Sequence, residues 1–447
     1  MLRRLVYTFF KEANILNNYT AEIIKNSLFD SIDQLLEHRD IYLNNPQKDF
    51  VRTQKISFRD TMLFPMLTSA ESVPAELLDF FPEITLPSQP AMNYRRNQIK
   101  VCAFQDLFKN FTSQLPQNKT FRGMRLIACD GTRLGTPFNP EDSDSYVECI
   151  EGRRGFNQYH LNTFYDALND VFLDAVIQNY FSMDEKLAFC EMLDRFPKDQ
   201  PSIITADRGY SSYNVLDHAI RSGHHFVFRL QASMGRNLFF NAVNELKKST
   251  FDIEDDIHIG RIRTKETKKL RNYHFLSTTK HYDHISKGSK DIDCYHLRLV
   301  KFELSSGNNE YLVTNLPKSQ FSFEDIKEIY RLRWTIETSY RFLKYPAGMI
   351  HSHSLKQSFI FQEVFAKLIC YNFCSAVRRS ISVTETTKKK HTYMIEISYL
   401  FKVCIRYLKN KVMDAESLIK KRMVPVRAGR KYERNLRRQH ADTLQYR

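Results

Sequence analysis

Residues 124–132 read MRLIACDGT, a short apolar run that ends at Asp130 and a glycine. An apolar run of this length, bounded by turn-forming residues, is typical of a strand buried within a sheet. Residues 201–210, PSIITADRGY, repeat the pattern, with Asp207 directly after the run and Gly209 two residues later. The sequence therefore predicts two buried strands, each ending at an acidic side chain.

The segments around these two strands complete a mixed pattern. Between them the sequence predicts a hairpin of two strands, residues 159–168 and 171–179, followed by a helix at residues 183–196. After the second buried strand it predicts a helix at residues 211–223 and a strand at residues 224–231. The order strand, strand, strand, helix, strand, helix, strand predicts an α/β domain.

The composition changes along the chain and divides it into five parts. We predict a helical N-terminal domain that is a candidate for DNA binding, an α/β domain in two parts with a β-rich insertion between them, and a basic, helical C-terminal region. In chain order, these parts are residues 1–95, 96–229, 230–310 (the insertion), 311–380 and 381–447.

The overall charge points to a polyanionic partner. The 447 residues carry a formal net charge of +15, with an isoelectric point near 9.3. Nucleic acid is the commonest partner of so basic a protein, although an ordinary basic enzyme remains an alternative. Lys and Arg are concentrated at residues 420–447, which we interpret as a phosphate-binding arm. The apolar fraction of 42% excludes a wholly disordered chain.

The eight cysteines indicate a reducing environment. They include no C-x-x-C pair, and Cys370 and Cys374 lie four residues apart in an apolar helical stretch, where we interpret them as core thiols. No uninterrupted apolar run approaches the roughly 18 residues that cross a bilayer. We therefore expect a cytoplasmic protein that does not bind a membrane.

A predicted helix at residues 321–345 carries an ordered polar stripe. At about 100° per residue, Tyr330, Arg333, Glu337 and Lys344 share one narrow face. An apolar stripe beside it consists of Ile329, Leu332, Ile336 and Leu343. A solvated helix would spread its charges more widely, although an exposed face with an Arg333–Glu337 pair remains an alternative.

Three carboxylates form the candidate catalytic set. Asp130 and Asp207 each follow an apolar strand, and catalytic groups in α/β sheets gather at the carboxyl ends of strands. Either aspartate alone would be an ordinary turn residue. Together with Glu337 on a helix, they have the composition of a two-metal phosphoryl-transfer site.

The motifs around these residues resemble those of a known family. Residues 330–344, YRLRWTIETSYRFLK, match the Tyr-Arg-Glu-Lys signature, Y-(2)-R-(3)-E-(6)-K, of bacterial insertion-sequence DDE transposases, the IS-four family of cut-and-paste transposases. The segments CDGT and ADRGY resemble the regions around the family's first and second aspartates. The resemblance covers most of the chain and is specific, because the full signature spacing follows both aspartates in order.

The resemblance implies a fold, a cofactor and a chemistry. It implies an RNase H-like catalytic domain interrupted by the β-rich insertion. It also implies two divalent ions, Mg²⁺ or Mn²⁺, held by Asp130, Asp207 and Glu337. Enzymes of this family cut the transposon end and join its 3′-OH to target DNA, and related members pass through a DNA hairpin. Tyr330, Arg333 and Lys344 would bind phosphates near the cleaved end.

The resemblance also implies partners and a location. The partners are double-stranded DNA, both terminal inverted repeats and target, and a second copy of the chain in a paired-end complex. The location is the cytoplasm of a bacterium, in association with the nucleoid. In one well-known member of the family, a tryptophan of the insertion stacks on a base flipped out at the hairpin, whereas the single tryptophan here, Trp334, lies in the signature helix. A Tyr or Phe of the insertion would substitute, since stacking needs only an aromatic face.

Two alternative functions remain open on the sequence. An RNase H-like nuclease without strand transfer would share the three carboxylates, but it has less reason to carry the Tyr-Arg-Glu-Lys stripe. A domesticated, non-enzymatic DNA-binding protein would be expected to have lost at least one of Asp130, Asp207 and Glu337, and all three are present.

Overall fold

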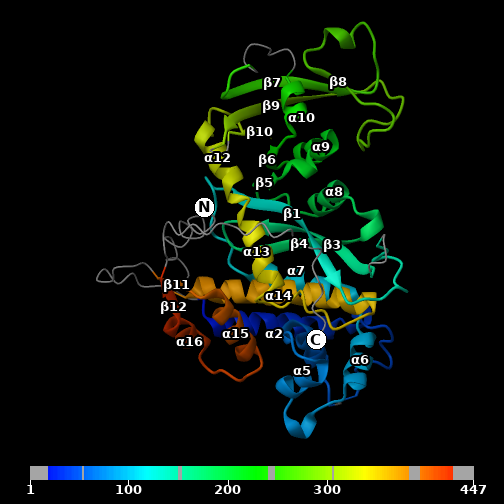
Figure 1. Cartoon of the computed structure of the whole chain (residues 1–447), viewed down its shortest axis with the longest axis vertical. Helices are drawn as coiled ribbons and strands as arrows, with labels where there is room; N and C mark the ends of the chain where they lie inside the picture. Colours follow the sequence, from blue (N-terminus) through cyan, green and yellow to red (C-terminus); the bar gives the residue numbers. More distant parts are fainter. Residues whose placement is uncertain are drawn as a thin grey trace.

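The protein is a mixed α/β fold, as predicted. The computed structural model describes six segments of the chain, namely residues 19–52, 55–149, 154–239, 247–304, 307–381 and 393–425. Within them, a mixed sheet of ten strands occupies the upper part of the molecule, and a layer of helices lies at its lower end (Figure 1). The larger hydrophobic core is shared between the sheet and this helical layer.

Five central strands carry the predicted order. They are β1 (Arg125–Thr136), β3 (Phe156–Asp166), β4 (Val171–Asn179), β5 (Ser202–Ala206) and β6 (His225–Arg229). Strand β3 is antiparallel to both β1 and β4, whereas β5 is parallel to β1, and β6 is parallel to β5. The predicted β3–β4 hairpin is confirmed, and its turn contains Asp170 at φ 55°, a conformation that aspartate tolerates.

Strand β1 is longer than the sequence indicated. It continues to Thr136, so the prediction that this strand ends at Asp130 is wrong. The reason is that β3 pairs with β1 well beyond Asp130, whereas β5 pairs with β1 only as far as Cys129 and Ala206. Asp130 and Asp207 therefore each follow the last pair of the parallel ladder, next to one another at its carboxyl end.

The strands of the predicted insertion continue the central sheet. They are β7 (Phe251–Gly260), β8 (Tyr273–Phe275) and β9 (Ile292–Glu303), preceded by the helix α10 (Ala232–Asn237). Strand β10 (Asn309–Thr314) lies between β6 and β9 and is antiparallel to both, and β9 pairs in turn with β7. The order across the sheet is β2-β3-β1-β5-β6-β10-β9-β7-β8, with β2 at Tyr146–Val147 and β4 on β3.

Two helices cover the central strands, close to their predicted positions. Helix α8 (Glu185–Asp194) begins after Asp184, whose side chain accepts backbone hydrogen bonds from Lys186 and Leu187. Helix α9 (Tyr213–Arg221) begins after Ser212, whose hydroxyl accepts from the N–H of Val215. These caps satisfy N–H groups that a helix start leaves free, which fixes where each helix begins.

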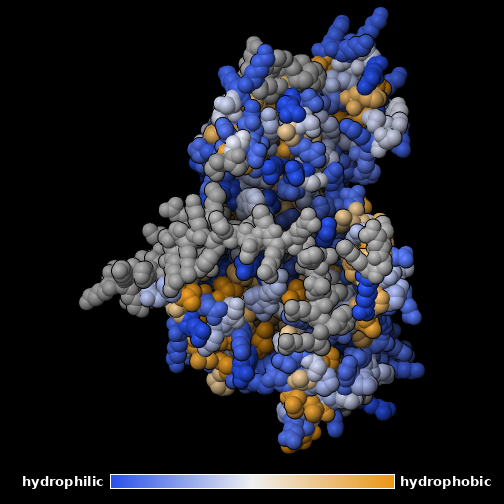
Figure 2. Space-filling view, viewed as in Figure 1, coloured by the Kyte–Doolittle hydropathy of each residue, from blue (hydrophilic) through white to orange (hydrophobic). Residues whose placement is uncertain are grey.

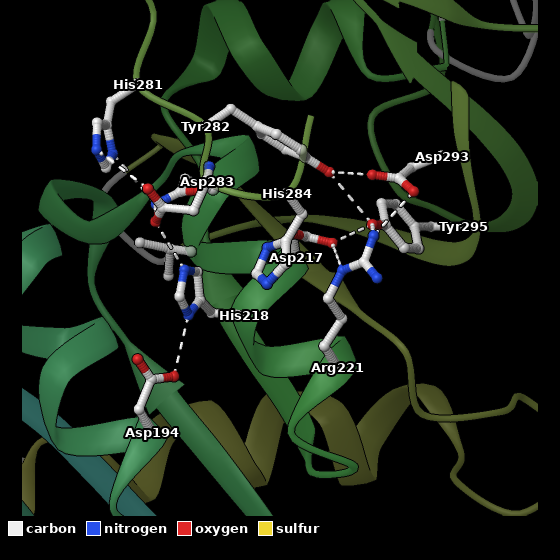
Figure 3. A network of polar contacts seen from close by, with 12 residues as sticks. Asp194, Asp217, His218, Arg221, His281, Tyr282, Asp283, His284, Asp293 and Tyr295 are labelled. Atoms are coloured by element: carbon white, nitrogen blue, oxygen red, sulfur yellow. Dashed lines mark hydrogen bonds and ion pairs between the residues drawn. The ribbon is translucent and has the colours of Figure 1, made fainter. Parts of the chain in front are cut away.

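A polar network joins α9 to the insertion (Figure 3). The fully buried Asp217 of α9 accepts hydrogen bonds from Arg221 Nε at 2.7 Å and from the hydroxyl of Tyr295. His218 Nε2 lies 2.9 Å from Asp283 of the loop before β9. Since Asp283 and Tyr295 belong to the insertion, these contacts hold it against the central domain.

The long helix α14 (Gln357–Ser380) forms the centre of the helical layer, as predicted at residues 356–379. Helices α2 (Ala21–Glu37), α4 (Phe58–Leu67) and α7 (Val101–Gln114) pack against it, so the N-terminal helices share a core with the α/β part. The remaining elements are α3 (Arg39–Tyr42), α5 (Val73–Phe80), η2 (Glu83–Thr85), α6 (Gln89–Gln98), η3 (Tyr180–Ser182), η4 (Arg208–Tyr210), η5 (Thr267–Lys269), β11 (Tyr393–Ile395), α15 (Ile397–Leu408), α16 (Ala415–Lys421) and β12 (Met423–Pro425).

Helix α14 is also long and apolar enough to cross a membrane, although no uninterrupted apolar run of about 18 residues occurs in it. Polar residues such as Glu363 and Lys367 interrupt its apolar run, yet the fold buries them with partners. Lys367 Nζ, for example, donates to the carbonyl of Thr68 at 2.6 Å. Because 94% of the most apolar window is buried inside the protein, α14 is a core helix.

The signature segment forms two helices, so the prediction of one continuous helix at residues 321–345 is wrong. Helix α12 (Phe323–Leu332) ends before Arg333, and α13 (Thr335–Lys344) begins after Trp334. The N–H groups of Arg333 and Trp334 bond to carbonyls three residues back, a tighter turn than the α-helix. This break gives α13 an N-terminus of its own, with Glu337 in its first turn.

The visible surface differs between the two ends of the molecule. Figure 2 shows a mostly hydrophilic surface over the insertion, with apolar patches gathered over the helical end. The exposed apolar side chains at that end include Leu78 and Ile84. The predicted phosphate-binding arm at residues 420–447 lies outside the described residues from residue 426 onward.

Candidate active site

The two predicted aspartates lie at the carboxyl ends of the paired part of β1 and of β5, within the central sheet. Asp130 Oδ1 accepts the N–H of Gly131 at 2.9 Å, and Asp207 Oδ1 accepts the N–H of Gly209 at 2.7 Å. The second of these bonds makes Asp207 the cap of the short helix η4. Each aspartate is thereby oriented by the glycine that follows it in sequence.

Arg333 brings the signature segment to this edge. Its Nη1 lies 3.7 Å from Asp130 Oδ2, and its Nη2 lies 3.4 Å from Glu337 Oε1. The Arg333 residue is only 3% exposed, whereas the Glu337 side chain is 40% exposed. A buried guanidinium thus bridges an acid on β1 and an acid on α13.

The titration behaviour of the site indicates crowded negative charge. Burial raises the pKa of the Asp130 carboxyl to about 7; the charges of Asp207 and Glu337 add to the rise, while Arg333 and the Gly131 N–H oppose it. Burial lowers the pKa of Arg333, but the neighbouring Tyr330 and the three carboxylates outweigh that effect and raise it. The structure therefore brings Asp130, Asp207 and Glu337 into one electrostatic group around Arg333.

Of the other two signature residues, Tyr330 lies beside Arg333, whereas Lys344 lies farther along α13. Tyr330 is 2% exposed, and burial raises the pKa of its hydroxyl to about 12. That hydroxyl has no hydrogen-bond partner among the described residues, and its ring lies 5.5 Å from the Arg333 guanidinium carbon. Lys344 is half-buried at the last residue of α13, two turns or about 10 Å beyond Glu337. Because Tyr330 belongs to α12 and Lys344 belongs to α13, the four signature residues do not form a stripe on a single helix.

Four neighbours of the site were not predicted from the sequence. Tyr340 of α13 donates its hydroxyl to the Asp130 carbonyl at 2.6 Å, which fixes α13 against β1. His160 and Asn162 of β3 and Glu185 of α8 lie against Gly131. Their positions in the sequence, within an ordinary strand and at an ordinary acidic helix start, carry no signal of a site.

The donor set suits a hard divalent cation. Carboxylate oxygens are the ligands that Mg²⁺ and Mn²⁺ prefer, and Asp130, Asp207 and Glu337 supply such oxygens here. Among the described residues, no three His, Cys, Asp or Glu side chains lie close enough together to hold an ion. Asp130, Asp207 and Glu337 therefore lie in one region, but their carboxylates are not close enough together to coordinate one ion.

Comparison with known proteins gives one family. The family model described as the transposase DDE domain matches residues 121–373, more than half of the chain. No curated protein sequence matches. A cryo-EM structure of the piggyBac transposase synaptic complex with hairpin DNA is similar in fold over 94% of this chain and 81% of that one, at 11% identity and a TM-score of 0.43.

Proposed function

The chain belongs to the family of transposases with a DDE domain, and on that premise we propose that it cleaves the ends of a DNA transposon and joins the 3′-OH to target DNA. The observation that carries the proposal is the grouping of Asp130, Asp207 and Glu337 around the buried Arg333. All three acids lie at the carboxyl end of the β1–β5 ladder or face it, where an α/β sheet exposes reactive groups.

We propose that the central sheet is an RNase H-like catalytic domain. The support is the order β4-β3-β1-β5-β6, with β3 antiparallel to the other central strands and a helix, α8, between β4 and β5. The insertion between Asp207 and Glu337 lengthens this sheet beyond β6.

Asp130, Asp207 and Glu337 would hold Mg²⁺ or Mn²⁺, in two ions. The cation would supply charge stabilisation for an in-line displacement at phosphorus, first by water and then by the 3′-OH. Arg333 neutralises part of the acidic charge and keeps Glu337 turned toward Asp130. The cation does not by itself position the scissile phosphate, so this role falls to side chains of the protein.

Arg333, Tyr330 and Lys344 are proposed to bind DNA phosphates near the cleaved end, as the Tyr-Arg-Glu-Lys subfamily would. The unpartnered hydroxyl of Tyr330 supports this role, because a buried donor without a partner is costly unless a ligand satisfies it. The insertion adds a second basic surface, made of exposed Lys and Arg side chains: Arg263, Lys265, Lys268, Lys269 and Arg271. An aromatic residue of the insertion would stack on a flipped base at a hairpin.

The subfamily, the bacterial origin and the assembly are parts of the same proposal. Two copies of the chain would assemble on paired transposon ends and cleave in trans, in the bacterial nucleoid. Cleavage of a single, unpaired end by a monomer would contradict this assembly.

The test is cleavage of a labelled duplex that carries the terminal repeats flanking the gene, with Mg²⁺ or Mn²⁺. Glu337→Gln should abolish nicking, whereas Glu324→Gln, on the exposed face of α12, is the matched control and should cut normally. Joining of pre-cleaved ends to a target plasmid separates a transposase from a nuclease. Binding without any cleavage by well-folded protein would favour a non-enzymatic DNA-binding protein.

A further inference from the structure

Glu185 is a fourth acidic residue beside the two aspartates. It is the first residue of α8, and its side chain reaches the edge of the sheet between two glycines. Its Oε1 lies 2.9 Å from the position that a Cβ of residue 131 would take, and its Oε2 lies 3.1 Å from the corresponding position at residue 209. The carboxylate therefore occupies the space that Gly131 and Gly209 leave open.

This position puts the Glu185 and Asp207 carboxylates around the same glycine, Gly209. Asp207 Oδ1 lies 3.0 Å from the same Cβ position at residue 209 that Glu185 Oε2 approaches to 3.1 Å. The Glu185 side chain is 34% exposed, so one part of it faces solvent and the other part faces the site. Two carboxylates around one glycine are oxygen donors that can bind the same divalent cation.

His160 of β3 holds Glu185 from the other side. It is 5% exposed, and its Nε2 lies 3.1 Å from Glu185 Oε1, a contact that does not have the geometry of a hydrogen bond. Its Nδ1 has no hydrogen-bond partner in the part of the chain that the structure describes. A buried imidazole that is poorly satisfied costs free energy, and such groups are retained where they serve a site.

A purely structural role explains Glu185 less well. An acidic residue in the first turn stabilises a helix through its dipole, but a side chain directed into solvent would do this equally well. The Asp184 cap already satisfies the free N–H groups of this helix start. The approach of the Glu185 carboxylate to both Gly131 and Gly209 needs another reason.

We propose that Glu185 is a fourth acidic ligand of the divalent-metal site and binds the cation that Asp207 holds, with His160 as its positioning residue. This inference rests on the proposed function, because it assumes the metal site of Asp130, Asp207 and Glu337. Four carboxylates around Arg333 would give the site the excess of negative charge that a divalent ion requires.

The test is Mn²⁺ binding to the whole chain without DNA, followed by the electron paramagnetic resonance signal of free Mn²⁺. Glu185→Gln keeps the shape and removes the charge, and it should weaken Mn²⁺ binding about tenfold or more. Glu191→Gln is the matched control, since Glu191 lies on the same helix, is exposed and pairs with Arg195. It should bind Mn²⁺ as the native chain does.

Asp207→Asn separates failure of this inference from failure of the proposed function. If Asp207→Asn loses Mn²⁺ and Glu185→Gln binds it normally, the role of Glu185 is overturned and the three-carboxylate site stands. If the native chain does not bind Mn²⁺, or Asp207→Asn binds it normally, both proposals fail. Should Glu185→Gln not fold, Glu185→Asp, which retracts the carboxylate, is measured in the same way and should also bind more weakly.

His160 is tested by the same titration. His160→Leu removes the ring nitrogens and should weaken Mn²⁺ binding, whereas His160→Gln keeps a polar donor near Glu185 and should restore most of the affinity. Unchanged Mn²⁺ affinity in His160→Leu would overturn the positioning role.

Discussion

Arg333 Nη1 lies 3.7 Å from Asp130 Oδ2, in a place where a positive charge competes directly with a cation for the same carboxylate. The guanidinium is buried and also contacts Glu337 at 3.4 Å. A residue so placed has two effects of opposite sign. In the proposed site it would lower the negative potential that attracts a metal ion, and it would offer a fixed donor to a phosphate group of DNA.

Arg333→Met should separate these two effects. Without the guanidinium, the three carboxylates should bind Mn²⁺ at least as tightly as in the native chain, while cleavage of a transposon end should fall about 100-fold because a preorganised phosphate contact is lost. Mn²⁺ titration and a single-turnover cleavage assay measure the two quantities. A parallel loss of metal binding and cleavage would show instead that Arg333 mainly orients the acids.

Gly131→Ala should damage the site with a limited loss of stability. An added Cβ would lie 2.3 Å from His160 Nε2 and 2.9 Å from Glu185 Oε1, so both side chains must move. We expect a destabilisation of about 1–3 kcal/mol from overpacking, together with a loss of cleavage larger than that of Gly209→Ala. The contacts at residue 209 are looser, at 3.0 and 3.1 Å. Equal and small effects of both substitutions on cleavage would contradict the close packing.

The sequence predicted the central strands and the positions of the two aspartates because these follow from local patterns. An apolar run followed by Asp-Gly or Asp-x-Gly shows both the strand and the acid that follows it. The end of β1 was not predictable in this way, since the strand continues past Asp130 only because β3 pairs with it there. The apolar residues before Asp130 do not indicate which strand will pair with the residues after it.

The site was predicted in part for a related reason. Glu337 and Arg333 stand at a recognisable spacing, whereas Glu185 and His160 come to the site from α8 and β3 through the fold alone. The break at Arg333 and Trp334 also has no local signal, because neither Gly nor Pro interrupts residues 321–345. Projection onto one straight helix therefore gave a stripe that the two helices α12 and α13 do not share.

Asp217→Asn should loosen the insertion from α9. Asp217 is fully buried and takes hydrogen bonds from Arg221 and Tyr295, so loss of its charge weakens both bonds, although the half-exposed Arg221 keeps Asp293 as a partner (Figure 3). We expect a loss of about 1–2 kcal/mol in the stability of this contact. Hydrogen exchange should then speed up in β9 while α14 stays protected. Unchanged exchange in β9 would mean that apolar packing alone holds the insertion.

Glu363→Gln should lower stability at neutral pH but not in acid. Glu363 of α14 is buried against Arg96 at 3.0 Å; burial alone would raise its pKa, but Arg96 and the hydroxyls of Ser354 and Ser352 outweigh burial and lower it below the usual 4.5. A carboxyl whose folded pKa is depressed stabilises the protein fully above its unfolded pKa, and this contribution is lost as the pH falls through the folded pKa. Native protein should therefore unfold at a higher temperature than Glu363→Gln at pH 7, and the difference should shrink below about pH 4.5. The substitution leaves Arg96 buried without its counter-charge, so the gap at neutral pH should correspond to about 3–5 kcal/mol.

A gap between the two melting temperatures that stays constant from pH 7 to pH 3 would contradict this assignment, because it would mean that Glu363 contributes through packing and not through its charge.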